Sequence, residues 1–307
     1  MMLIYELTNY CDSEYKSQDT EHVCSDCTHQ HECSGGCKNC LEEVHYPTRY
    51  PQGKKDYDCS NLINFYMCDY SFKYASEMLY LLSQSEALKE IDNYHIISIG
   101  CGGCPDLMAF ESYVLSTYPS KKIQYYGIDK NVLWKPIHNQ IKAYLPMSRA
   151  KMRVKYVYDD AIDFFGRKTI EDANVIVIQY LISHLYNTNQ IAKINQFYGN
   201  LISNLIIHRE SKNPFVILIN DVNSCYRGRD CFKELCDRLA ENGLEGSYRQ
   251  FYFDYRIQNE SQRYGMKHIS TEILYDIPDG FEIYQPWTQC SSAQLLIEIG
   301  RRDDNDN

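Results

Sequence analysis

Apolar and polar positions change their spacing along the chain, and the spacing predicts its elements. From Asn61 to Leu82 apolar residues recur every three or four positions after Ser60, a suitable N-cap residue, which predicts a helix. After this helix, short aliphatic runs alternate with helical patterns. The runs predict strands at His95–Gly100, Ile123–Ile128, Val154–Asp159, Asn174–Tyr180 and Pro214–Asn220. The patterns between them predict helices at about Asp106–Thr117, Leu133–Tyr144, Ala161–Phe165, Gln190–Ile207 and Asp230–Glu241.

The predicted strands are continuously apolar, which is typical of parallel strands covered on both faces. Their alternation with helices predicts an α/β fold with a doubly wound, mostly parallel sheet. Two later runs, Gln250–Tyr255 and Gln294–Gly300, have no crossover helix between them. They predict an antiparallel pair at one edge, which brings the sheet to seven strands. Residues 301–307 are charged and are predicted to form a disordered tail.

The first 59 residues differ in composition from the rest. Six of the 14 cysteines lie between Cys11 and Cys40, and aliphatic residues are few, so this segment cannot fold by apolar burial alone. We therefore expect three parts: a cysteine-rich module at 1–59, a connecting helix at 60–90, and an α/β domain at 91–300.

The charge balance and the lack of long apolar runs limit the function classes. With 31 Lys and Arg against 41 Asp and Glu, the net charge is −10, which opposes sequence-independent binding to duplex DNA. No apolar run reaches the roughly 18 residues of a membrane span, and Glu6 interrupts the N-terminal run before a signal-peptide core could form. We expect a soluble, cytoplasmic protein whose cysteines serve metal or thiol chemistry rather than disulfides.

Two C-x-x-C pairs in the N-terminal segment predict a metal site. Each pair can place two sulfurs at the separation that tetrahedral zinc coordination requires. A zinc site with four protein ligands has no open position and is structural. His29, His31 and Cys33 lie between the pairs and compete for the same role. The expected ligands of a structural Zn²⁺ are Cys24, Cys27, Cys37 and Cys40.

A glycine-rich turn follows the first predicted strand. The strand ends at Gly100 and continues into Cys101-Gly102-Gly103-Cys104-Pro105-Asp106 before the next helix. In a doubly wound sheet this turn lies at the carboxyl ends of the strands, where ligands bind. Glycines let the backbone approach a ligand, and the following helix N-terminus offers free N–H groups. The second strand ends at Asp129, whose carboxylate could accept from both hydroxyls of a ribose. The ligand is therefore expected to contain a nucleoside.

The turn departs from the dinucleotide fingerprint G-x-G-x-x-G, because Pro105 stands at its last glycine. Over about residues 90–300 the chain resembles the class I S-adenosylmethionine-dependent methyltransferases, in which a strand closes with a G-x-G turn and the next strand ends in an acid. The resemblance implies S-adenosylmethionine as cofactor, with its methionine part at the glycines, its ribose at Asp129 and its adenine beside Asp160. The expected cofactor-binding residues are Gly100, Cys101, Gly102, Gly103, Asp106, Asp129, Asp160, Ala161 and Gln179.

The end of the fourth strand is where the resembling family faces the methyl group. Methyl transfer requires a positioned acceptor, exclusion of water and sometimes removal of one proton. Tyr180 and His184 are four residues apart and share a face if the chain is helical there, so they are the candidate catalytic residues. A structural role for His184 is the alternative. The Asn/Asp-Pro-Pro-Tyr tetrad of nucleic-acid amino-methyltransferases is missing from this position, which disfavours methylation of DNA bases.

Polar residues also follow the fifth strand. Two arginines there could hold a carboxylate or phosphate in bidentate fashion, although a solvated loop and a helix cap are the favoured explanation. The candidate substrate-binding residues are Asn220, Asp221, Arg227 and Arg229. The acceptor is expected to be a small molecule or a protein side chain, and an RNA loop stacked on some of the 28 tyrosines is a further possibility.

Two other functions compete with methyl transfer. One is a non-catalytic nucleotide-sensing or interaction module on the same fold. The other is a radical S-adenosylmethionine enzyme, because Cys33-x3-Cys37-x2-Cys40 has the spacing that such enzymes use to hold a 4Fe–4S cluster. The radical enzyme would require a β/α barrel after these cysteines.

Overall fold

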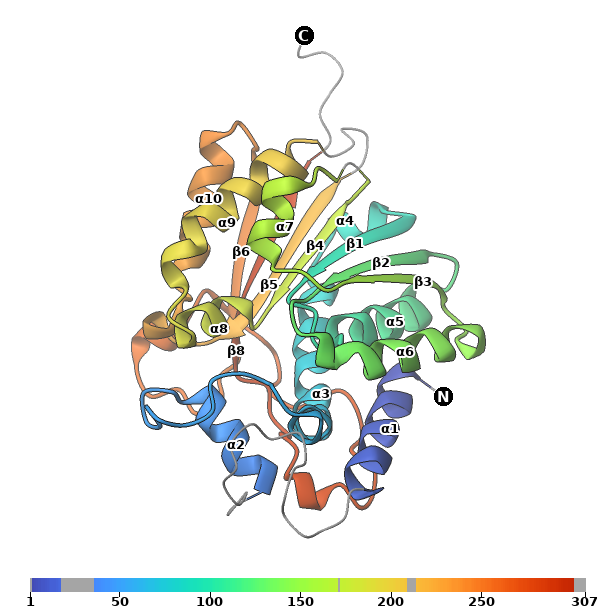
Figure 1. The fold of residues 1–307 in the computed structure, drawn as a ribbon. Coiled ribbons are helices and arrows are strands. Elements are labelled where there is room, and N and C mark those ends of the chain that lie inside the picture. Colours follow the sequence, from blue (N-terminus) through green and yellow to red (C-terminus); the bar gives the residue numbers. More distant parts are fainter. Residues whose placement is uncertain (1, 18–35, 171, 209–213, 301–307) are drawn as a thin grey trace.

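The computed structural model describes residues 2–17, 36–170, 172–208 and 214–300. Their strands form one eight-stranded sheet in the order β3-β2-β1-β4-β5-β8-β6-β7 (Figure 1). The strands are β1 (Asn93–Ile99), β2 (Lys122–Ile128), β3 (Lys151–Val157), β4 (Val175–Gln179), β5 (Phe215–Val222), β6 (Gly246–Tyr252), β7 (Met266–Lys267) and β8 (Ser292–Ile299). The predicted α/β class is confirmed, and β7 extends the sheet by one short strand beyond the seven expected.

The first five strands are parallel, and β8 reverses the direction. β1 pairs in parallel with β2 and β4, while β8 runs antiparallel to both β5 and β6. The predicted antiparallel pair is therefore confirmed. Because β5 and β8 lie inside the sheet and carry helices or loops on both faces, almost every residue in them is buried. This open sheet is not the β/α barrel that a radical S-adenosylmethionine enzyme would require.

Helices cover both faces of the sheet (Figure 1). One face carries α1, α3, α5 and α6, and the other carries α7, α9 and α10. The helices are α1 (Leu3–Ser17), α2 (Gly36–His45), α3 (Ser60–Ser83), α4 (Ala87–Glu90), α5 (Pro105–Thr117), α6 (Lys135–Tyr144), α7 (Ala161–Arg167), α8 (Leu181–Asn187), α9 (Ile194–Leu201) and α10 (Cys231–Glu241). None of the helices in the described part of the chain is long and apolar enough to cross a lipid bilayer.

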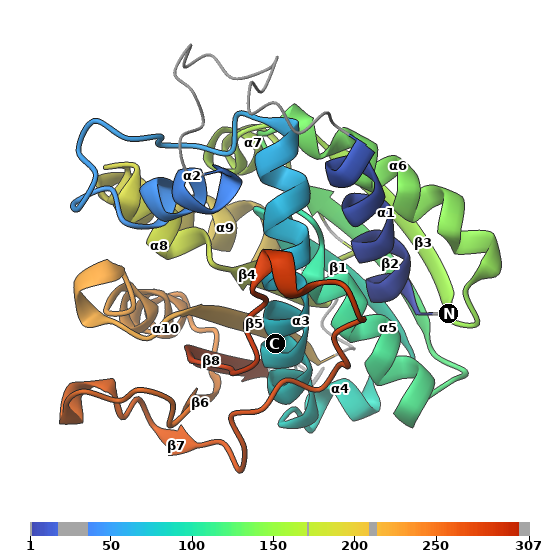
Figure 2. The ribbon, with the colours of Figure 1, turned by 90° about the horizontal axis from the view of Figure 1, so that it is seen from below.

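The long helix α3 joins the N-terminal helices to the sheet. Most of its 24 residues are buried, because α1, α2 and α5 all pack against it. Leu3 of α1 and Leu41 of α2 belong to the same apolar core as Ile96 of β1. Figure 2 shows α2 beside α3 and α8 at the end of the sheet where β1 and β4 finish. The expected boundaries at residues 59 and 90 stay predictions, but the described N-terminal helices share their core with the sheet.

Candidate functional site

A cavity of about 280 Å³ lies at the carboxyl ends of β1, β2 and β4. The chain leaves β1 toward β2 and β3 on one side and returns to β4 and β5 on the other. This reversal of strand order separates the flanking loops and leaves a crevice, which is where open α/β sheets bind ligands. The loops after the strands form one wall, which we call the sheet side. It consists of Gly100, Gly102, Asp129, Asp159, Asp160, Ala161 and Gln179.

The glycine turn and Asp129 are bonded directly to each other. Gly100 and Gly102 have positive φ values of 68° and 46°, a conformation that favours glycine. The N–H of Gly102 donates to Asp129 Oδ2 at 2.9 Å, and the N–H of Asn131 donates to Oδ1 at 2.8 Å. Burial raises the pKa of Asp129, and these two N–H groups oppose the rise. Each carboxylate oxygen can still accept a second hydrogen bond from a ligand.

Two further polar residues complete the sheet side. Asp160 is the N-cap of α7 and accepts from the N–H of Ile162 at 2.9 Å, while Ala161 follows it along the cavity. Gln179 ends β4 and donates from Nε2 to the carbonyl oxygen of Tyr74 at 2.9 Å. Its Oε1 is buried and has no hydrogen-bond partner within the described residues. An unpartnered buried acceptor on a cavity wall is suited to a ligand donor.

Three residues expected to bind cofactor do not line this cavity. The side chain of Cys101 points away from it, toward Gly127. A Cβ on Gly103 would collide with Met67 of α3, so this glycine permits close helix packing. Asp106 is buried in the first turn of α5 and accepts from the hydroxyl of Tyr125 at 2.9 Å. Burial is the main cause that raises the pKa of Asp106 to about 7.

Of the expected substrate-binding residues, Arg227 lines the cavity and Asn220, Asp221 and Arg229 do not. Asp221 accepts from the N–H groups of Ile182 and Ser183 at 2.9 and 3.1 Å, so it stabilises the start of α8. Burial raises the pKa of Asp221 to about 6. Arg229 is buried and donates to Asn223 Oδ1 at 2.6 Å, which holds the loop after β5 in place.

The opposite wall comes from α2, α3 and the segment after α2, and we call it the helix side. Tyr66, Tyr70 and Tyr74 follow one another at four-residue intervals on α3 and line the cavity. The rings of Tyr66 and Tyr70 stack with centroids 5.3 Å apart. Tyr74 stacks on Tyr180, which also lines the cavity, with ring centroids 4.0 Å apart. This wall is not among the sites predicted from the sequence, although the four-residue spacing of its tyrosines is visible there.

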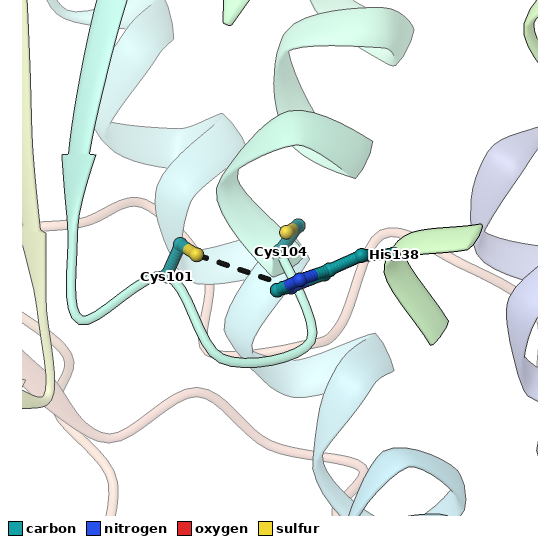
Figure 3. Close-up of side chains that lie close together, drawn as sticks. All are labelled: Cys101, Cys104 and His138. Atoms are coloured by element: carbon teal, nitrogen blue, oxygen red, sulfur yellow. Dashed lines mark hydrogen bonds between the residues drawn. The ribbon is translucent and has the colours of Figure 1, made fainter. Parts of the chain in front are cut away.

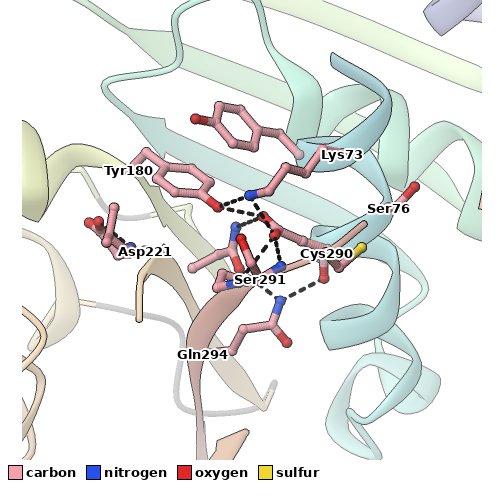
Figure 4. Close-up of polar contacts among 12 residues, drawn as sticks. Lys73, Ser76, Tyr180, Asp221, Cys290, Ser291 and Gln294 are labelled. Carbon is pink, nitrogen blue, oxygen red and sulfur yellow. Dashed lines mark hydrogen bonds and ion pairs between the residues drawn. The ribbon is translucent and has the colours of Figure 1, made fainter. Parts of the chain in front are cut away.

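A buried polar network lies at the base of the helix side (Figure 4). Lys73 Nζ is 2.7 Å from Glu77 Oε1, and the two side chains are only 5% and 0% exposed. Lys73 also donates to Tyr180 Oη at 2.7 Å, and this hydroxyl donates to Glu77 Oε2 at 2.6 Å. Asn220 Nδ2 donates to the same carboxylate at 3.2 Å. The Tyr180 hydroxyl is thus fixed between the two charged groups of an ion pair.

Two histidines lie near the same space. The ring nitrogens of His45 are 3.1 Å from Tyr70 Oη and 2.8 Å from Tyr57 Oη. Burial, reinforced by Lys73, lowers the pKa of His45 to about 3. His184 lines the cavity from α8, and burial also lowers its pKa. Both rings are therefore neutral at neutral pH, and a neutral imidazole can accept a proton.

Only part of the expected zinc set can be placed. Cys24 and Cys27 lie outside the described residues, as do His29, His31 and Cys33. Cys37 and Cys40 are three positions apart in α2, Cys37 buried and Cys40 half-buried. Residues at this spacing lie on one face of a helix.

No protein-family model and no curated protein matches the sequence. Solved structures resemble the fold at low identity. The plantazolicin methyltransferase BamL in complex with SAH is 13% identical, with 87% of this chain and 98% of that chain covered at a TM-score of 0.48. A chain from Listeria monocytogenes, described as a class I S-adenosylmethionine-dependent methyltransferase, is 10% identical. The match covers 99% of this chain and 90% of that chain at a TM-score of 0.46. The small RNA methyltransferase HEN1 is 12% identical, and the match covers 76% of this chain and 26% of that chain at a TM-score of 0.44. These neighbours are methyltransferases, but at such low scores they decide neither activity nor site residues.

Proposed function

We propose that this protein is an S-adenosylmethionine-dependent methyltransferase. The observation that carries the proposal is the sheet side of the cavity, where the glycine turn, Asp129 and Asp160 meet at the reversal of strand order. Open α/β sheets bind nucleotide-like ligands at this place. The acceptor oxygens of Asp129, Asp160 and Gln179 there suit the hydroxyl and amino groups of a nucleoside joined to an amino acid.

Several residues of the sheet side would each take one part of the cofactor. A Cβ on Gly100 would lie 3.1 Å from the Leu181 side chain, so the glycine keeps the backbone close to the space that the cofactor's methionine part would occupy. Asp129 would accept from the ribose hydroxyls, and Asp160 with Ala161 would flank the adenine. Gln179 Oε1 is buried and has no hydrogen-bond partner in the described part of the chain, so it is available to a cofactor N–H or O–H group. When bound, the cofactor supplies a methyl group that is activated by a sulfonium.

The chain's own residues would position and deprotonate the acceptor. Tyr74 and Tyr180 present stacked rings that exclude water from the reacting atoms. His184 is the residue that would take a proton, because its pKa is lowered by burial and its ring is neutral at physiological pH. Arg227 adds a positive charge at the same end of the cavity, where it could orient an anionic group of the acceptor.

The aromatic helix side favours a flat or aromatic small molecule, or a protein side chain, as acceptor. An RNA base could stack on the same rings, whereas the net charge of −10 disfavours duplex DNA. The protein would work in the cytoplasm. We further propose that Cys24, Cys27, Cys37 and Cys40 hold a structural Zn²⁺ that anchors α2 beside the cavity.

Calorimetry tests the cofactor directly. S-adenosylmethionine and S-adenosylhomocysteine should bind with micromolar affinity, and Asp129→Asn should weaken both by about 10- to 100-fold, because a charged acceptor is lost. Asp237→Asn, at a half-exposed carboxylate on α10, is the matched control and should leave affinity unchanged. NAD serves as the comparator ligand. If neither cofactor form binds to folded protein, the proposal fails; tight binding without methyl transfer to any acceptor class would favour a sensing module.

A further inference from the structure

Three potential metal ligands lie close together at the glycine turn, two from the turn itself and one from α6 (Figure 3). One donor atom from each of Cys101, Cys104 and His138 lies within 4.8 Å of the other two. Cys101 Sγ and His138 Nε2 are 4.0 Å apart. The three residues are 4%, 0% and 1% exposed, and none of them lines the cavity described above. They form a separate, enclosed group.

The backbone brings the two sulfurs together. The N–H of Cys104 donates to the carbonyl oxygen of Cys101 at 2.7 Å, which closes a tight turn over four residues. Cys104 itself adopts a positive φ of 59°, an unusual conformation for a residue with a side chain. Gly127 of β2 leaves room for the first sulfur, because a Cβ there would lie 2.8 Å from Cys101 Sγ. The local sequence is therefore arranged around both thiols.

The imidazole of His138 is held in one orientation. Its Nδ1 lies 2.9 Å from the hydroxyl of Tyr158, and its ring stacks on Tyr156 with centroids 3.9 Å apart and planes 4° apart. These contacts direct Nε2 toward the sulfurs and the Gly102 carbonyl oxygen, which is 2.8 Å away. Metal-binding histidines usually have this arrangement, with the second ring nitrogen hydrogen-bonded to an outer group.

We propose that Cys101, Cys104 and His138 form a structural binding site for a zinc-class divalent ion. Two thiolates and an imidazole are ligands that zinc prefers, and calcium or magnesium would instead require oxygen ligands. The carbonyl oxygen of Gly102 lies against both His138 Nε2 and Cys104 Sγ, at 2.8 and 3.7 Å, so it can fill the fourth position. Since all three side chains are buried, the ion would have no open position for a substrate, which indicates a structural role.

Metal binding requires the two thiols and one ring nitrogen of His138 to give up their protons. Each thiol releases its proton to solvent when its sulfur binds the ion. In the metal-free chain His138 Nε2 donates to the Gly102 carbonyl oxygen, because a carbonyl can only accept. On metal binding the ring proton moves to Nδ1, which then donates to the hydroxyl of Tyr158. No electron is transferred, and no oxidant is needed.

The site would also act on the cavity through Gly102. This residue lies between the two cysteines, and its N–H donates to Asp129. A metal that fixes the turn would therefore fix the position of the Asp129 carboxylate. This consequence rests on the proposed function, whereas metal binding itself does not.

Cobalt substitution in the full chain tests the site. Thiolate-bound Co²⁺ gives a strong charge-transfer absorption, and anaerobic titration of metal-stripped protein gives its stoichiometry. The variant Cys24→Ser/Cys27→Ser removes the N-terminal pair, so we expect it to retain thiolate-bound cobalt. Adding His138→Asn to this variant should abolish tight binding, whereas adding Cys236→Ser, at a half-buried cysteine of α10, should not. X-ray absorption of the zinc-loaded Cys24→Ser/Cys27→Ser protein should show two sulfur neighbours at about 2.3 Å.

A milder variant keeps the test informative if ligand variants do not fold. Tyr158→Phe keeps every ligand but removes the hydroxyl that orients His138, and it should weaken metal affinity about 10- to 100-fold. The proposal is overturned if Cys24→Ser/Cys27→Ser binds no cobalt through sulfur, or if adding His138→Asn leaves its titration unchanged. If the protein binds the metal with the expected stoichiometry but does not bind S-adenosylmethionine, only the proposed function is contradicted.

Discussion

The sheet side of the cavity is made of glycines, backbone N–H groups and carboxylates, whereas the helix side is made of tyrosine rings, a lysine and a histidine. On the sheet side each polar residue lies within a few positions of a strand end, so the main chain sets its place. On the helix side the rings of Tyr66, Tyr70 and Tyr74 are placed by how α3 packs on the sheet. The sheet side therefore follows from strand topology, whereas the helix side depends on long-range packing.

The sharpest test of the helix side removes the carboxylate of Glu77. Glu77→Ala leaves the buried Lys73 ammonium without its partner, and the N–H groups of Ser291 and Ser292 lose their acceptor. We expect the free energy of unfolding to fall by about 3–5 kcal/mol, measured by urea denaturation. Asp237→Ala breaks an exposed ion pair on α10 and should change stability by less than about 1 kcal/mol.

A double variant separates the charge from the packing. Lys73→Met/Glu77→Leu removes both charges and should recover part of the lost stability, because no buried charge is left unpaired. A loss below about 1 kcal/mol for Glu77→Ala would show that the Glu77 carboxylate, through its bonds to Ser291 and Ser292, does not hold α3 to the sheet.

The next effect is a pH dependence that arises from His45. Its pKa is lowered from 6.5 to about 3, mainly by burial, so the unfolded chain binds a proton between these values and the folded chain does not. Stability from this group is complete above pH 6.5 and is lost as the pH falls, by at most about 1.4 kcal/mol per pH unit. Urea unfolding of wild type and His45→Gln at several pH values measures the contribution as a difference.

The comparison between wild type and His45→Gln is needed because other groups change stability with pH in the opposite direction. Asp106 and Asp221 have pKa values raised to about 7 and about 6, and they gain stability as the pH falls through that range. Both carboxylates are present in wild type and variant, so their effect cancels. If the two proteins lose stability in parallel below pH 6.5, His45 is not held neutral by the fold.

The smallest effect tests the sheet side with a matched pair of glycines. Gly100 and Gly243 have nearly equal φ values of 68° and 67°, but a Cβ on Gly243 would meet nothing within 4 Å. Alanine at either position should cost about 1–2 kcal/mol of stability from backbone strain. Only Gly100→Ala should also weaken S-adenosylmethionine in calorimetry, by about 10-fold, since its Cβ would push on Leu181 or enter the ligand space. Equal effects of both variants on ligand affinity would contradict a cofactor role for the turn.

The strands and the glycine turn were predictable because their signals are local. Continuous aliphatic runs predicted β1, β2, β4 and β5 within a few residues, since strands buried on both faces need apolar side chains throughout. Gly100, Gly102 and Asp129 were predictable because each lies within three residues of the end of a strand. The two-residue strand β7 was not predicted, because its pairing with β6 leaves no hydrophobic pattern of its own.

The helix side was not predictable in the same way. Tyr66 and Tyr70 fit the apolar pattern of α3, and that pattern cannot tell core tyrosines from tyrosines that line a cavity. Glu77 lies on α3 and its partner Tyr180 follows β4, more than 100 residues later. The same limit applied to Cys101 and Cys104, which were visible as a pair, whereas His138 joins them from α6.

Local sequence signals were sufficient to predict the α/β class, the parallel strands and the glycine turn with its acidic partner. These depend on side-chain periodicity and on the conformational freedom of glycine, and both act over short stretches of chain. Three placements are seen in the folded chain alone: Gly103 and Asp106 lie away from the cavity, Tyr180 is bound by an ion pair, and His138 lies beside two thiols. Those placements result from the packing of α3 and α6 against the sheet, and long-range packing leaves no periodic signal in the sequence.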